Sequence, residues 1–127
     1  MRYALILAVA LAAGAPPIGG QPAATILVRL SNFSFSPDTI RLHPGQAYVL
    51  RMENSAGGGH DFTAREFFAA ATIATESRRW IVDGTVEVPA GESREIALTA
   101  PAAGRYKVRC THRFHRLLGM SGSIVVG

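Results

Sequence analysis

Turn signals rich in glycine and proline interrupt this chain at short intervals, and that punctuation constrains its fold more than any other feature. Examples are Pro44-Gly45, Pro89-Ala90-Gly91 and Pro101-Ala102-Ala103-Gly104. The runs between them are rich in Val, Ile, Leu and Thr, and apolar and polar residues alternate in several of them. Short alternating runs bounded by turn residues are typical of strands that bury one face. The sequence therefore predicts an all-β protein.

The strands that we expect are spaced as in a sandwich of two sheets. The 127 residues leave room for one domain, and we predict a Greek-key β-sandwich of about seven to eight strands. The predicted strands are 25–30, 40–43, 48–53, 85–88, 95–99, 105–110 and 123–126.

One segment departs from the strand pattern. Residues 64–76, AREFFAAATIATE, are rich in Ala and Glu and contain little turn chemistry. We expect a short helix inserted around 64–76. Thr63 followed by Glu66 has the spacing of a capping box, so Thr63 is the predicted N-cap.

The N-terminus has the layout of a secretory signal. Arg2 provides a positive charge, an apolar run follows over 3–13, and small-residue cleavage motifs lie within that run. We assign 1–20 to a signal peptide, cleaved between about 12 and 24, and expect a periplasmic or secreted domain over 24–127. An uncleaved membrane anchor is the alternative. After cleavage we expect no stable membrane insertion, because no later segment is long and apolar enough.

Export makes the single cysteine, Cys110, informative. Cysteines in oxidising compartments are normally paired, and this chain offers no partner. Cys110 must therefore be buried, joined to another molecule, or bound to a metal.

Metal-binding side chains surround that cysteine in the sequence. His115 follows Cys110 by five residues and Met120 follows His115 by five more, while His60 comes directly after Gly57-Gly58-Gly59. In a sandwich the loops at one end converge, so these four side chains can meet. One thiolate, two imidazoles and a weak thioether suit copper cycling between two oxidation states. Zinc fits less well, because thioethers are not among its usual ligands.

A nucleophilic Cys110–His115 pair is the competing chemistry. The cysteine does not begin a helix, and the chain is too short for a substantial substrate cleft. We therefore predict that the protein is not an enzyme.

With these residues in place, the chain resembles the cupredoxins, the small blue-copper proteins such as pseudoazurin, plastocyanin and azurin. The resemblance covers nearly all of 24–127, through the motifs PGQAYVLRMEN, GGGHDF, VPAGE, GRYKVRC and HRLLGMSGSIVV. It implies a cupredoxin domain with one type 1 copper ion, bound by His60, Cys110, His115 and Met120. The HRLLGM ending is similar to pseudoazurin and plastocyanin, whereas the five-residue step from cysteine to histidine is similar to azurin.

Two positions depart from the family pattern. Asp61 stands where cupredoxins commonly have Asn after the first ligand. We expect its carboxylate to accept a hydrogen bond from the hydroxyl or backbone of Thr111 and to orient the ligands. His112 is an additional imidazole two residues after Cys110. It can replace His115 as ligand, bind a second ion or face solvent, and the spacing to Met120 favours His115.

The charge distribution suggests a partner. The net charge is +4, and five basic residues without an acid surround Cys110. They form either a solvated face or a basic rim that docks an acidic redox partner, such as a cytochrome or oxidase domain. Nucleic-acid binding is disfavoured, because aromatic-interleaved basic runs are absent. The five residues are Arg105, Lys107, Arg109, Arg113 and Arg116.

These observations lead to a predicted function. We expect an exported, monomeric blue-copper electron-transfer protein, with His115 reaching the surface through an apolar patch of Phe114, Leu117 and Leu118. The alternative is a periplasmic copper-binding homeostasis or delivery protein, or a cupredoxin-like accessory module. A copper enzyme with two cupredoxin domains would need a longer chain and a second histidine set.

Overall fold

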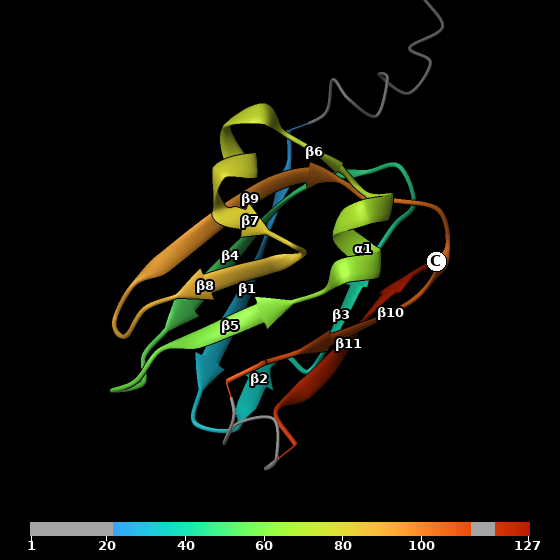
Figure 1. Ribbon diagram of the computed structural model, residues 1–127. Coiled ribbons are helices and arrows are strands. Elements are labelled where there is room, and N and C mark those ends of the chain that lie inside the picture. The colour runs from blue at the N-terminus through green and yellow to red at the C-terminus, as the bar shows by residue number, and fades with distance from the viewer. Residues whose placement is uncertain (1–21, 113–118) are drawn as a thin grey trace, which may run out of the picture.

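The computed structural model describes residues 22–112 and 119–127, and it is a sandwich of two β-sheets (Figure 1). The predicted fold class is confirmed. The predicted signal peptide lies outside the described residues. In the part of the chain that is described, no helix is long and apolar enough to cross a membrane.

The first sheet has five strands in the order β2-β1-β4-β9-β6. β1 and β4 run parallel, whereas the other neighbours are antiparallel. The strands are β1 (Ala24–Ser31), β2 (Ser34–Ser36), β4 (Ala47–Asn54), β6 (Thr72–Ile73) and β9 (Ser93–Thr99).

The second sheet has six strands in the order β3-β11-β10-β5-β8-β7. Only β11 and β3 pair in parallel within it. The strands are β3 (Thr39–Leu42), β5 (His60–Thr63), β7 (Ile81–Val82), β8 (Thr85–Val88), β10 (Gly104–Arg109) and β11 (Ser121–Val126).

Alternating side chains from both sheets form the core. On β4, Tyr48, Leu50 and Met52 are buried while the residues between them are partly exposed. On β10, Val108 is buried between exposed basic residues, and Cys110 continues the same inward parity just beyond the strand. Every predicted strand is observed, with bounds that differ by one or two residues at several ends. The additional strands, among the described residues, are two to four residues long: β2, β5, β6 and β7.

The helix prediction over 64–76 was wrong in extent. Helix α1 covers only Arg65–Ala70, and a 3-10 helix, η2, covers Thr75–Trp80. Between them Thr72 and Ile73 pair with β9 as strand β6, because β-branched residues fit the edge of a sheet.

The predicted N-cap was also wrong. Ala64 occupies that position, and no side chain caps it. Thr63 instead ends β5, where its hydroxyl donates to Asp61 Oδ1 at 2.8 Å and pairs with the Thr85 hydroxyl at 2.9 Å. These bonds within the sheet replace the capping bond that the sequence suggested.

Gly122 allows β11 to lie close against the residue that precedes β3. A Cβ at this position would overlap the backbone carbonyl oxygen of Asp38. That oxygen is fixed, because it accepts a 2.8 Å hydrogen bond from the N–H of Ser123. The backbone at Asp38 and the backbone of β11 therefore cannot move apart without breaking this hydrogen bond.

We predict that Gly122→Ala lowers the free energy of unfolding by about 1–3 kcal/mol, as overpacking does. Chemical denaturation of the metal-free protein measures this change. Gly57→Ala is the matched control, because a Cβ there meets nothing within 4 Å. Equal stability of the two variants would contradict this account of β11.

Candidate metal centre

Cys110 lies at one end of the sandwich and is fully buried. It follows β10 directly, and its N–H donates to the carbonyl oxygen of Met120 at 3.1 Å. This bond joins the residue after β10 to the residue before β11. Cys110 and Met120 are therefore held side by side at the backbone, and both are at most 1% exposed.

A buried asparagine shapes the loop that leads to His60. Asn54 ends β4, and its Nδ2 donates to the carbonyl oxygens of Gly58 and Val88, each at 2.9 Å. Its Oδ1 accepts from the N–H of Ala56 at 3.0 Å. Three bonds from one side chain thus fix the glycine-rich turn before His60. This role of Asn54 was not predicted from the sequence, although an Asn that ends a strand before a turn is a recognised signal.

His60 and Cys110 face each other within the core. His60 begins β5 and is fully buried, and its Nδ1 lies 4.0 Å from the Cys110 Sγ. Metal–thiolate and metal–imidazole bonds are about 2.3 and 2.0–2.1 Å long in zinc sites, and their sum exceeds this separation. One ion can therefore touch both atoms, and the contacts of His60, Cys110 and Met120 fit a copper site.

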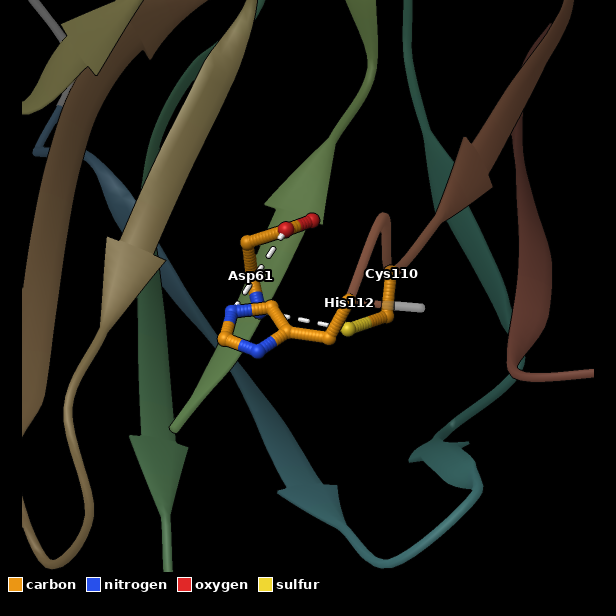
Figure 2. A group of neighbouring side chains, drawn as sticks. All are labelled: Asp61, Cys110 and His112. Carbon is orange, nitrogen blue, oxygen red and sulfur yellow. Dashed lines mark hydrogen bonds and ion pairs between the residues drawn. The ribbon is translucent and has the colours of Figure 1, made fainter. Parts of the chain in front are cut away.

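Asp61 connects β5 to the segment that contains Cys110 and Thr111 (Figure 2). Its N–H donates to the Cys110 Sγ at 3.4 Å. Its carboxylate accepts from the N–H of Thr111 at 2.9 Å and from the Thr111 hydroxyl at 2.6 Å. The predicted bond between Asp61 and Thr111 is thus confirmed, for both the backbone and the hydroxyl. This carboxylate is only 2% exposed, so the connection is protected from water.

His112 lies at the surface beside this cluster. Its Nε2 is 2.7 Å from Glu87 Oε1 and 3.8 Å from Asp61 Oδ2. Ligand atoms of Asp61, Cys110 and His112 all lie within 4.8 Å of one another. The structure thus places His112 between two carboxylates. His115, with Phe114, Leu117, Leu118 and two of the five rim residues, lies outside the described residues.

The surroundings of Cys110 raise the pKa of its thiol. Burial raises the pKa of its thiol. The backbone N–H groups of Asp61 and His112 lower this pKa, while the charges of Asp61 and Glu87 raise it further. The net direction is upward, so the metal-free protein keeps the thiol protonated at neutral pH.

The fold and the site define a metal-binding β-sandwich with thiolate, imidazole and thioether donors, a set that suits copper. The family of copper binding proteins known as the plastocyanin/azurin family matches residues 24–127. This chain therefore belongs to that family, and copper is the metal of its site.

Solved structures of auracyanins share the fold, and each covers 84% of this chain. Auracyanin from the photosynthetic bacterium Roseiflexus castenholzii has a TM-score of 0.62 at 19% identity over 99% of its length. Auracyanin B has a TM-score of 0.63 at 26% identity over 91%. Auracyanin A, a blue copper protein from Chloroflexus aurantiacus, has a TM-score of 0.59 at 22% identity over 100%. Comparison with curated proteins finds no match by sequence.

The raised pKa of Cys110 predicts how the stability of the metal-free protein depends on pH. Above the ordinary thiol pKa of about 8.5, the unfolded chain releases a proton that the folded protein retains. The free energy of unfolding should therefore fall as pH rises, by up to about 1.4 kcal/mol per pH unit. Denaturation under reducing conditions at pH values from 7 to about 10 measures this slope. Cys110→Ala should show a shallower decline, and parallel curves would contradict the prediction.

The buried charge of Asp61 predicts an effect on the reduction potential. A carboxylate this close to the thiolate stabilises the oxidised, more positive copper, so Asp61→Asn should raise the midpoint potential by at least on the order of tens of millivolts. Thr111→Val is the matched control, because it removes one hydrogen bond and keeps the charge. Voltammetry of the copper-loaded variants measures both. An unchanged potential in Asp61→Asn would dispose of the idea.

Proposed function

We propose that this chain is an exported type 1 copper protein that carries single electrons between redox partners. The proposed ligands are His60, Cys110, His115 and Met120. The observation that carries the proposal is the buried pair of His60 Nδ1 and Cys110 Sγ, 4.0 Å apart at the end of a β-sandwich. Membership of the plastocyanin/azurin family supports it.

The chain's own residues keep the ligands in one arrangement. Asn54 fixes the turn before His60, and Asp61 fixes Thr111 next to Cys110. The bond from the Cys110 N–H to the Met120 carbonyl oxygen holds β10 and β11 together at this end. Such supporting contacts orient ligands before the metal arrives. A fixed arrangement of ligands suits electron transfer, because the copper ion then changes its charge while the protein around it stays in place.

Copper bound at these donors would supply a reversible one-electron couple between its two oxidation states. Cys110 must lose its proton to act as a ligand, because the thiolate is the binding form. The N–H of Asp61 then donates to the negative sulfur, on which a hydrogen bond is worth more than on a neutral thiol. Burial of His60 and Cys110 excludes water from the pair.

A basic surface supports a partner of opposite charge. Arg105, Lys107 and Arg109 are exposed along the outer face of β10, the strand that leads to Cys110. We propose that an acidic redox protein, a cytochrome or an oxidase domain, approaches through the basic rim. Weak contacts of small area would suit such short encounters. The proposed location is the periplasm or the extracellular space, following removal of 1–20.

Copper homeostasis or delivery is the second candidate. His112 favours it, because a partly exposed imidazole next to two carboxylates is not needed for electron transfer. A delivery protein should pass copper to an acceptor at a measurable rate, whereas a carrier should show a reversible potential and fast self-exchange.

The direct test is addition of one equivalent of Cu(II) to the purified protein, followed by visible and EPR spectroscopy. The proposal predicts an intense thiolate-to-copper charge-transfer band. Cys110→Ser should abolish this band, because the hydroxyl oxygen cannot replace the thiolate. A wild-type protein that binds Cu(II) without the band would overturn the proposal.

A further inference from the structure

A series of polar side chains leads from solvent to the buried cysteine. The side chain of Glu87 is 55% exposed, that of His112 is 35% exposed and that of Asp61 is 2% exposed. Cys110 is fully buried behind them. The proposed type 1 ligands do not include Glu87, His112 or Asp61, so this polar series needs its own explanation.

The centre of the series is the Nε2 atom of His112. It lies 2.7 Å from Glu87 Oε1 and 3.8 Å from Asp61 Oδ2, so it has one carboxylate on the solvent side and another on the buried side. A carboxylate only accepts hydrogen bonds, so the Nε2 contacting Glu87 carries a proton. A divalent cation replacing that proton would have an imidazole nitrogen and carboxylate oxygens as ligands. Cu(II) binds such nitrogen and oxygen sets.

We propose that Glu87, His112 and Asp61 form a copper-capture site, from which the ion passes to Cys110. The inference rests on the proposed type 1 function, since it describes how that centre is filled. It assigns His112 a role in loading that neither electron transfer nor the four proposed ligands require.

The capture site lies directly beside the final site. Ligand atoms of His112, Asp61 and Cys110 all lie within 4.8 Å of one another (Figure 2). The rings of His112 and His60 have centroids 6.5 Å apart. Gly59, the residue before His60, lies against this site, because a Cβ there would stand 3.4 Å from both Glu87 Oε1 and His112 Cε1. An ion can therefore move from His112 to His60 while the Cys110 Sγ remains within reach of both.

The protons balance in this sequence without any change of oxidation state. Binding of the ion at Nε2 of His112 moves the imidazole proton to Nδ1. Passage to Cys110 releases the thiol proton to solvent and frees the imidazole. The imidazole proton then returns from Nδ1 to Nε2 and restores the bond to Glu87. One ion enters and one proton, that of the thiol, leaves.

The test is the rate at which metal-free protein acquires the charge-transfer band after mixing with excess Cu(II) in a stopped-flow instrument. In the wild-type protein the rate should level off at high copper concentration, because capture precedes transfer. His112→Ala should load about 10–100-fold more slowly, by analogy with the loss of metal affinity or activity when groups that support metal ligands are removed. Glu87→Gln should slow loading by a smaller factor, because the imidazole remains. His43→Ala is the matched control, since it removes an exposed imidazole that follows β3 at the far end of β11.

The outcomes separate the inference from the function on which it rests. Equal loading rates in wild-type protein and His112→Ala would overturn the capture site and leave the type 1 centre intact. Loss of the final band in His112→Ala would also overturn it, because His112 would then be a ligand of the mature centre. A wild-type protein without any band would overturn both the capture site and the proposed function.

Discussion

The site depends on the contacts of one buried residue, Asp61. Its backbone N–H reaches the Cys110 sulfur, and its carboxylate binds the backbone and hydroxyl of Thr111. Within the described residues, β5 and β10 pair in register at one residue pair, Arg109 with Thr63. The side-chain bonds of Asp61 therefore supply much of the connection between the segments that carry His60 and Cys110. In a site excluded from water such bonds are strong, because no solvent competes for them.

Asp61 also brings a negative charge into the site, and the groups around it stabilise that charge by hydrogen bonds. The Thr63 and Thr111 hydroxyls and the Thr111 N–H donate to the carboxylate, and His112 lies on its solvent side. An Asn at this position would provide one acceptor and no charge. His112 Nε2 lies 3.8 Å from Asp61 Oδ2, so the two residues that depart from the family pattern face each other beside the proposed copper site.

Much of the fold could be predicted because alternating burial and turn chemistry are local properties. The strands over 48–53 and 105–110, and the inward parity of Cys110, followed from such patterns. Residues 64–76 could not be predicted correctly, because alanine-rich composition favours a helix while pairing of Thr72 and Ile73 with β9 depends on a distant strand. Asn54 was missed for the same reason, since one of its partners, Val88, lies 34 residues away. The contact between Asp61 and Thr111 was predicted only because the family resemblance aligned the two loops.

Every proposed role in this site requires His60 and Cys110 to bind one copper ion together. X-ray absorption spectroscopy of the copper-loaded protein tests it most directly, because it reports the atoms bound to the metal. Joint binding predicts one short copper–sulfur bond together with imidazole nitrogens, and loss of an imidazole contribution in His60→Ala. A copper environment of nitrogen and oxygen atoms without sulfur would contradict it.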